Sequence, residues 1–300
     1  MLKKTAKYIY ASFLYHVKLT ERIKYLKERK SVLAIYDHDP SPEDFEKYIR
    51  WLLHKGFEFI SLEELLHYLD GETALSSSKI WFTLDDGWRG NLELLSVIEK
   101  YQVPVTLFIP THAVETGFYR DTLEQVFSEK LPEAYKGDLR KLHDIPNAER
   151  TKTDAPLFEK AKDKLPREAI TVEELKMLSE HQMISIGLHT HTHPVLTQCS
   201  GEEIKTELEI NREKLREYTG TAPVVLALPY GRYNEKVLQT VHENNTAYVA
   251  ASDSGLIDQT NVTNALPRNG IAKASFYENC CRMLDFWYPN VAKLNSVIRF

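Results

Sequence analysis

Three histidines stand at alternate positions in the stretch ISIGLHTHTHPVL, residues 184–196. They are His189, His191 and His193. Imidazole nitrogens are common ligands of zinc and related divalent cations, so this run is a candidate metal site. An extended segment would place all three histidines on one face, whereas a turn or helical start before Pro194 would bring together only His189 and His193. The spacing alone leaves both selections open.

A pair of adjacent carboxylates offers a second chemical group. Asp85 and Asp86 follow an apolar run in the stretch IWFTLDDG. On a regular strand the two side chains would point to opposite faces, but Gly87 permits a bend that turns both towards one place. Crowded carboxylates repel each other unless a positive charge lies between them. A divalent cation held by one carboxylate and two neutral imidazoles meets that demand and leaves positions open for water and substrate.

Both motifs follow short apolar runs, and such runs recur along the chain. The predicted strands are residues 32–36, 57–60, 80–84, 105–109, 183–187, 224–228 and 247–251. Amphipathic segments lie between them, and capping boxes at Ser61/Glu64, Thr171/Glu174 and Ser200/Glu203 mark three helix starts. Because the runs are continuously apolar, we expect strands buried on both faces, as in a parallel sheet wrapped by helices. About seven such units favour a barrel over an open sheet.

In such barrels the chemistry lies where strands end and the following loops begin. The sequences at these ends are DHDP after 32–36, DDGWRG after 80–84, LHTHTHP after 183–187 and PYGRYN after 224–228. Acids, imidazoles and a Pro-Tyr-Gly turn are therefore expected to meet at one rim. Trp88 and Tyr233 lie on these loops, where an aromatic ring could stack on a bound substrate. Burial in the outer packing of the barrel is the alternative for Trp88.

Three of these motifs resemble, in order, the signatures of the polysaccharide deacetylase family, carbohydrate esterase family 4, also known as the NodB-homology domain. The motifs are TLDDG (83–87), HTHTHP (189–194) and LPYG (228–231). The resemblance implies an α/β fold, a distorted (β/α)7-type, TIM-like barrel. It also implies that Asp86, His189 and His193 bind a divalent metal. Zinc is the first expectation, with cobalt, nickel or iron as alternatives.

The same resemblance implies roles for further residues. Asp85 would be the general base, and the backbone N–H of Tyr230 would stabilise the oxyanion. His191 would then be a spare histidine outside the metal's ligand set. The expected activity is hydrolysis of N-acetyl groups, or of O-acetyl groups, on a glycan or glycan precursor. The alternatives are an amidase acting on a small non-sugar carbon–nitrogen bond, and a glycan- or metal-binding relative with weak turnover.

Two features depart from the common pattern of that family. Many members place a proton-donating histidine near the C-terminal end of the domain, but the last histidine here is His242, in a predicted helix. His38, or a proton returned by Asp85, is the candidate replacement. Many members also pair the base with an arginine where this chain has Ala227. Arg268, in the stretch LPRNGI, is the candidate for that function.

The remaining sequence predicts the organisation around the site. Residues 31–285 are the expected catalytic barrel, with an insertion at its rim over 115–170 that acts as a lid or specificity element, or is a mobile solvated excursion. Residues 1–30 are expected to form an amphipathic helical segment, which packs on the barrel or makes weak contact with a membrane surface. Residues 286–300 are expected to form a C-terminal extension.

Composition narrows the cellular context. The chain has 38 Lys and Arg residues against 43 Asp and Glu residues, and this balance gives no indication of nucleic-acid binding. Three cysteines, Cys199, Cys280 and Cys281, make a poor disulfide framework and favour a reducing compartment. Because no secretion signal or membrane-spanning run is recognised, the sequence predicts a cytoplasmic protein.

Overall fold

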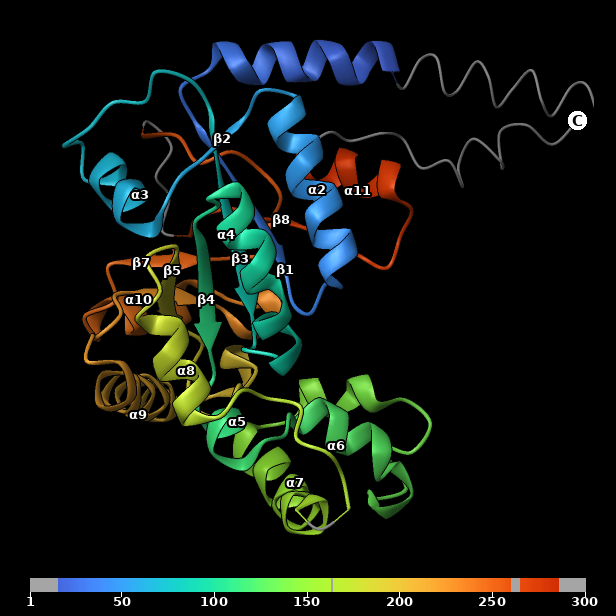
Figure 1. The fold of residues 1–300 in the computed structure, drawn as a ribbon. Helices are drawn as coiled ribbons and strands as arrows, with labels where there is room; N and C mark the ends of the chain where they lie inside the picture. The colour runs from blue at the N-terminus through green and yellow to red at the C-terminus, as the bar shows by residue number, and fades with distance from the viewer. Residues whose placement is uncertain (1–15, 163, 260–264, 286–300) are drawn as a thin grey trace, which may run out of the picture.

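A computed structural model describes residues 16–162, 164–259 and 265–285. Within these residues a parallel sheet has the strand order β7-β6-β5-β4-β3-β1-β8, and β2 pairs with the beginning of β3 (Figure 1). The strands are β1 (Val32–Asp37), β2 (Glu58–Phe59), β3 (Lys79–Asp85), β4 (Val105–Ile109), β5 (Ile184–Leu188), β6 (Val225–Ala227), β7 (Tyr248–Ala250) and β8 (Asn269–Gly270). Each of the seven predicted runs therefore contains a strand.

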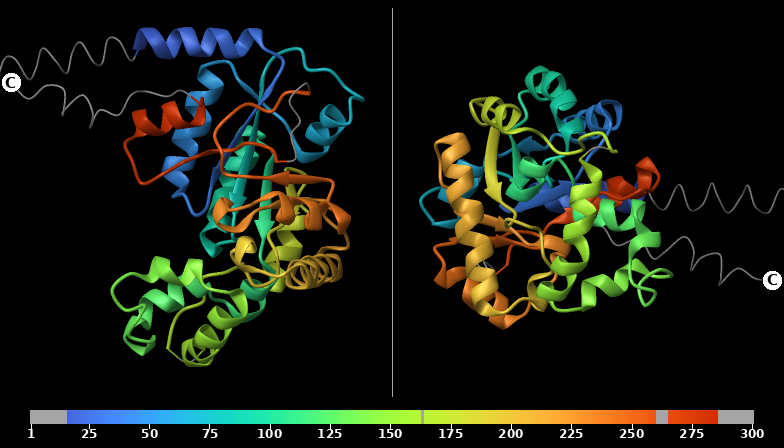
Figure 2. Two further views of the ribbon diagram at one scale, coloured as in Figure 1. Left: turned by 180° about the vertical axis from the view of Figure 1, so that it is seen from behind. Right: turned by 90° about the horizontal axis from the view of Figure 1, so that it is seen from below.

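Helices surround this sheet, as the alternating sequence pattern predicts (Figure 2). They are α2 (Pro42–His54), α3 (Leu62–Leu69), α4 (Leu95–Tyr101), α5 (Thr111–Thr116), α6 (Arg120–Val126), α7 (Asn147–Ala161), α8 (Val172–Ser179), α9 (Gly201–Thr219), α10 (Glu235–Glu243) and α11 (Phe276–Met283). Short 3₁₀ turns include η3 (Leu139–Asp144) and η5 (Pro229–Gly231). The three predicted capping boxes are present, at the starts of α3, α8 and α9.

The strands are buried on both faces, which explains their continuously apolar sequences. Alternate residues such as Leu33 and Phe82 belong to the large core between the sheet and the helices. The other residues face inward, and Trp81 and Phe108 fill the interior of the barrel, with ring centroids 6.0 Å apart. Gly187 on β5 makes room for this packing, because a Cβ there would lie 2.3 Å from the ring of Phe108.

The chain segment 266–270 links the two ends of the sheet. Ala250 of β7 forms a parallel bridge with Leu266, and β8 pairs with β1 through Ile35 and Asn269. No strand is predicted at β8, because its two residues are asparagine and glycine. Between the two pairings, this segment carries Arg268 into the protein interior, where the residue is 1% exposed.

The predicted insertion forms a small helical lobe beyond the C-terminal ends of the strands (Figure 1). It contains α6, η3 and α7, so the described part is not an irregular excursion. The lobe has an apolar core of its own. That core consists of Phe118, Leu123, Leu131, Leu142, Leu157 and Ala161. The lobe therefore lies where its side chains can reach the loops that follow the strands.

Residues 16–28 of the predicted N-terminal segment are helical and lie against the barrel. Leu19 and Leu26 are buried in the large core, and Arg22 donates hydrogen bonds to the Leu284 carbonyl oxygen and the Asp285 carboxylate. The first half of that segment and the predicted extension 286–300 lie outside the described residues. None of the described helices has the length and apolar character needed to cross a membrane.

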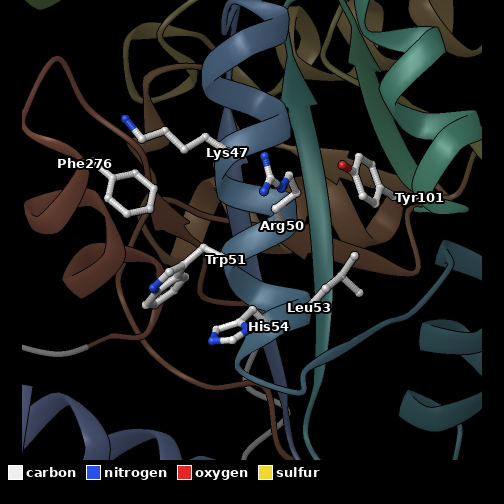
Figure 3. Close-up of a pocket in the computed structure, with 7 residues that line it drawn as sticks. All are labelled: Lys47, Arg50, Trp51, Leu53, His54, Tyr101 and Phe276. Atoms are coloured by element: carbon white, nitrogen blue, oxygen red, sulfur yellow. The ribbon is translucent and has the colours of Figure 1, made fainter.

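A surface hollow lies between α2, α11 and the end of α4, away from the catalytic rim (Figure 3). Its lining residues are Lys47, Arg50, Trp51, Leu53, His54, Tyr101 and Phe276. The Lys47 ammonium lies 4.7 Å from the centroid of the Phe276 ring. None of the predicted site residues lines this hollow, so the chemistry has to be sought at the strand ends.

Candidate active site

The Asp-Asp-Gly motif turns sharply at the end of β3. Asp86 and Gly87 both have left-handed backbone conformations, with φ of 73° and 69°. For an L-residue such as Asp86 this conformation costs roughly 1–2 kcal/mol. The turn directs Asp85 to Arg268 and Asp86 to the histidine loop. A Cβ on Gly87 would lie 2.8 Å from Cδ1 of Ile109, the end of a side chain that can shift, so the left-handed conformation is the main reason for glycine here.

The histidine loop also turns instead of extending the strand. Thr190 and His193 have φ of 63° and 56°, both left-handed. As a result, the Nε2 atoms of His189 and His193 lie 3.2 Å apart. His191 points elsewhere, and its Nδ1 lies 2.9 Å from the hydroxyl of Thr111. The spacing allowed two arrangements, and the structure has the second, in which His189 and His193 lie together.

Helix α9 holds the histidine loop through two buried polar side chains. The Glu207 carboxylate accepts hydrogen bonds from the backbone N–H groups of His191 and Thr192, at 2.9 and 2.7 Å. One turn further on, Asn211 accepts from the N–H of His189 at 3.1 Å and donates to the carbonyl oxygen of Ile109 at 2.9 Å. Our reading of the sequence missed both residues. Polar side chains spaced i, i+4 on the buried face of a helix were the available signal.

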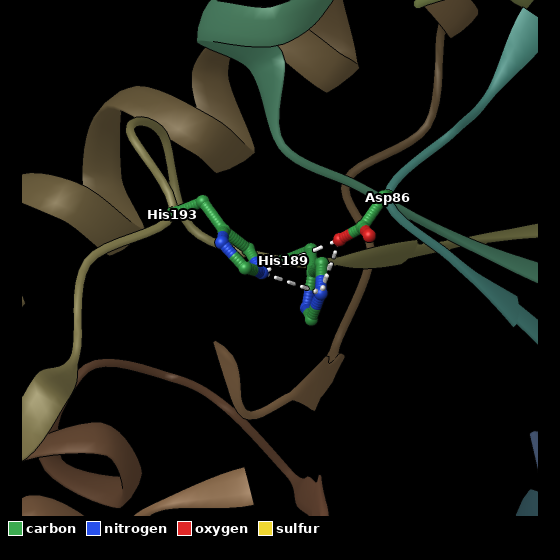
Figure 4. A group of neighbouring side chains, drawn as sticks. All are labelled: Asp86, His189 and His193. Atoms are coloured by element: carbon green, nitrogen blue, oxygen red, sulfur yellow. Dashed lines mark hydrogen bonds and ion pairs between the residues drawn. The ribbon is translucent and has the colours of Figure 1, made fainter. Parts of the chain in front are cut away.

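Asp86, His189 and His193 form a compact cluster (Figure 4). Asp86 Oδ1 lies 3.3 Å from the Nε2 atom of each histidine. A tetrahedral zinc ion with ligand bonds of 2.0–2.1 Å has ligand-to-ligand edges of about 3.3 Å. The three distances therefore match one face of such a coordination sphere. Two imidazole nitrogens at 3.2 Å also require a proton or a cation between them.

Neighbouring groups orient these three donor atoms. Nδ1 of His189 lies 2.8 Å from the carbonyl oxygen of Ala227, and a carbonyl only accepts, so Nδ1 carries the proton and Nε2 presents its lone pair. Trp88 donates from Nε1 to Oδ2 of Asp86 at 3.2 Å, which leaves Oδ1 facing the histidines. These contacts are typical of the outer partners of metal ligands.

Burial and charge set the protonation of this cluster. Burial lowers the pKa of His193 to about 4, which leaves its imidazole neutral near pH 7. Burial alone would raise the pKa of Asp86, but its hydrogen bond with His189 lowers the pKa overall. Burial alone would lower the pKa of His189, but its hydrogen bond with Asp86 and the charges of both aspartates raise it overall, so a cation bound there would replace the Nε2 proton.

Asp85 forms a buried, bidentate ion pair with Arg268. Nη1 and Nη2 of Arg268 donate to Oδ1 and Oδ2 of Asp85 at 2.7 and 2.8 Å. The guanidinium also donates to the Thr83 hydroxyl and the Ala251 carbonyl oxygen, each at 3.0 Å. Burial alone would raise the pKa of Asp85, but the charges of Arg268 and His189 lower it overall, so the group is a carboxylate near neutral pH.

The other candidate residues occupy the same rim with different exposure. His38 is exposed at the end of β1, and its carbonyl oxygen accepts a hydrogen bond from Asn91 at 2.9 Å. Its ring lies near that of Tyr36 on the same strand, with the ring centroids 5.9 Å apart. Tyr233 is 37% exposed and donates to Asp253 at 2.7 Å.

Trp88 is only half-buried, but its ring already has a partner. Its centroid lies 4.2 Å from that of Tyr119, which belongs to the loop before α6. Together with the hydrogen bond to Asp86, this packing fixes the indole between the barrel and the lobe. One face of the Trp88 ring is therefore covered by Tyr119, whereas the Tyr233 side chain is exposed.

The sequence model of the family described as polysaccharide deacetylase matches residues 73–249, more than half of the chain. The chain belongs to the polysaccharide deacetylase family. A Bacillus subtilis protein that carries the name of a polysaccharide deacetylase, YxkH, is 19% identical over 227 residues. That alignment covers 75% of this chain and 63% of YxkH, so the chain spans less than two thirds of this relative.

Two solved structures share the fold of this family member. The Streptococcus pyogenes deacetylase PplD, in complex with acetate, superposes with a TM-score of 0.61 at 19% identity, covering 86% of this chain and 99% of PplD. IcaB from Ammonifex degensii gives a TM-score of 0.62 at 14% identity, covering 86% of this chain and 97% of IcaB. These matches confirm the predicted distorted (β/α)7-type barrel.

Proposed function

We propose that this member of the polysaccharide deacetylase family is a metal-dependent hydrolase that removes N-acetyl groups from a glycan or glycan precursor. One observation carries the proposal. Three converging donor atoms, from Asp86, His189 and His193, lie beside the ion-paired carboxylate of Asp85. The donor set of one carboxylate and two imidazoles suits zinc, with cobalt, nickel or iron as alternatives.

A divalent cation bound by these donors supplies Lewis acidity, which polarises the acetyl carbonyl group and makes water more acidic. Asp85 then accepts the proton of the attacking water as general base. Both of its oxygens accept from Arg268 and still keep a further lone pair each, so the ion pair holds the carboxylate in place without blocking it. The backbone N–H of Tyr230 donates to the oxyanion as the tetrahedral intermediate forms.

The departing amine needs a proton before it leaves. His38 is the proposed donor, because it is exposed at the end of β1, on the rim that also carries both aspartates. A proton returned by Asp85 is the second route. Tyr233 offers an exposed ring for stacking on a sugar. In this proposal, Trp88 supports Asp86 and lines the sugar side of the site.

The test is acetate release from N-acetylated oligosaccharides and acetylated sugar precursors by protein loaded separately with zinc, cobalt or nickel. Asp85→Asn should abolish release while the protein still binds one metal ion. The matched control is Asp70→Asn, which removes an aspartate that pairs with Tyr248 at an exposed position. A metal-loaded wild-type protein that releases no acetate from any glycan, yet hydrolyses small amides, would replace this proposal with the amidase function.

A further inference from the structure

We infer that the helical lobe is part of the active site, because Asp121 and Arg150 are positioning residues that hold the turn at Tyr230. This inference rests on the proposed function, in which the N–H of Tyr230 faces the oxyanion. It assigns a role to the inserted segment beyond covering the rim.

The Tyr230 side chain leaves the barrel and enters the lobe. Its hydroxyl donates to Oδ2 of Asp121 at 2.5 Å and accepts from Nη1 of Arg150 at 3.1 Å. Its ring lies between two imidazoles, 4.6 Å from His143 of the lobe and 4.8 Å from His193 of the proposed metal site. This one side chain therefore connects the lobe to the metal cluster.

The backbone at this position needs such an anchor. Tyr230 has φ of 58° and ψ of 4°, a left-handed conformation that asparagine or glycine adopts more readily than tyrosine. Gly231 follows with φ of 62°, and a Cβ there would lie 1.7 Å from the Ser252 hydroxyl oxygen. The turn therefore contains two consecutive left-handed residues, and side-chain contacts offset the cost of the first.

The partners of Tyr230 are themselves fixed. Arg150 is buried, and its Nε and Nη2 donate to the two carboxylate oxygens of Glu124 at 2.7 and 2.9 Å. Its Nη2 also donates to Oδ1 of Asp121 at 2.8 Å. The same Asp121 oxygen lies 2.9 Å from Nε2 of His143. Helices α6 and α7 thus present a preformed acceptor and donor to the tyrosine hydroxyl.

A metal site is the other reading of this cluster. The ligand atoms of Asp121, Glu124 and His143 lie close enough together to hold a cation. However, the guanidinium of Arg150 already donates hydrogen bonds to both carboxylates and neutralises part of their charge. The geometry therefore favours a positioning network built on arginine over a second metal site.

The test compares Tyr230→Phe, Asp121→Asn and the double variant with the wild-type protein. Tyr230→Phe keeps the ring and removes only the hydroxyl contacts. The matched control is Tyr248→Phe, which removes a tyrosine–aspartate hydrogen bond of 2.6 Å to Asp70, away from the rim. All variants should keep cooperative unfolding and the wild-type zinc stoichiometry, because none of them removes a proposed ligand.

The first measurement is hydrogen–deuterium exchange in the peptide that covers 226–234, where the N–H of Gly231 donates to the Leu228 carbonyl oxygen at 3.0 Å. Exchange should rise several-fold in both single variants and not in Tyr248→Phe. The double variant should exchange no faster than the single variants, because each change breaks the same link. Unchanged exchange in Tyr230→Phe would overturn the inference, whether or not the protein proves to be a deacetylase.

The second measurement is acetate release. Mispositioning of a catalytic group by a fraction of an ångström should lower kcat by about 10- to 100-fold and leave KM nearly unchanged. Wild-type kcat in Tyr230→Phe, with an active wild-type enzyme, would refute the inference and leave the proposed function standing. If the wild-type protein releases no acetate, the proposed function fails, and the exchange data alone decide whether the lobe positions the turn.

Discussion

Arg268→Met should destabilise the protein strongly, because it leaves the carboxylate of Asp85 buried without its partner. The side chains of Arg268 and Asp85 are 1% and 5% exposed, and the guanidinium makes both hydrogen bonds to the carboxylate. Methionine keeps much of the length and the apolar contacts of the arginine stem. The substitution therefore removes mainly the charge and the hydrogen bonds.

The expected cost is about 3–5 kcal/mol, the usual consequence of breaking a buried ion pair by removing one partner. For a domain of this size, each kcal/mol corresponds to roughly 2–4 °C in Tm, so Tm should fall by roughly 6–20 °C. Asp85→Asn should also be costly, because it leaves the guanidinium buried with its charge unpaired. The double variant should recover at least about 2 kcal/mol of the summed loss, because removing both charges leaves neither unpaired.

The assay is urea denaturation of the four proteins with metal chelated throughout, so that altered metal binding does not enter the comparison. Arg140→Met is the control, because Arg140 makes a bidentate pair with Asp138 at 2.8 and 3.0 Å, but its side chain is 83% exposed. This control should leave the unfolding transition in place. A loss below about 1 kcal/mol in Arg268→Met, or additive losses in the double variant, would refute the reasoning.

Three further predictions concern the metal cluster and its support. His193→Ala should abolish high-affinity zinc binding, measured against a chromophoric chelator, whereas His191→Gln should retain it. Glu207→Gln should weaken zinc binding by about 10- to 100-fold, because the histidine loop loses a charged acceptor. The control is Glu202→Gln, at an exposed position of the same helix, which should bind zinc as the wild-type protein does. Gly87→Ala should lower the free energy of unfolding by about 1–3 kcal/mol in denaturant titrations, since it combines a positive φ with a close approach to Ile109. Equal zinc affinity of His193→Ala and wild type, or a Gly87→Ala protein as stable as wild type, would contradict these expectations.

The strands and the placement of chemistry at their ends could be predicted, because parallel strands buried on both faces leave a continuous apolar record in the sequence. Strand β8, which has two residues, could not be predicted in this way. Residues Asn269 and Gly270 of β8 have no apolar pattern, and their pairing with Ile35 and Tyr36 depends on residues more than 230 positions away. Local periodicity carries no information about such a contact.

The helical lobe was harder to predict for a different reason. Several buried positions of α6 and α7 hold charged residues, among them Glu124, Arg150 and Asp154. Because these positions are charged, the apolar periodicity that predicts an amphipathic helix is missing, and the segment is predicted to be solvated and irregular. Some of these charged residues also form the network around Tyr230. The buried charges that make α6 and α7 hard to predict therefore also connect the lobe to the site.

The arginine beside Asp85 shows why a site can be complete when its sequence motif is not. Ala227 stands where the family resemblance leads one to expect an arginine, and its small side chain lies in the barrel interior with Phe108. Arg268 enters the same interior from the segment that links the two ends of the sheet, with its guanidinium 5.2 Å from the Phe108 ring. Asp85 requires a buried positive charge beside it. This requirement sets the position of the guanidinium, but the arginine that carries it can come from more than one chain segment. Two arginines in this interior would face one carboxylate and leave a positive charge unpaired, so a small residue at position 227 is the consistent partner of an arginine at 268.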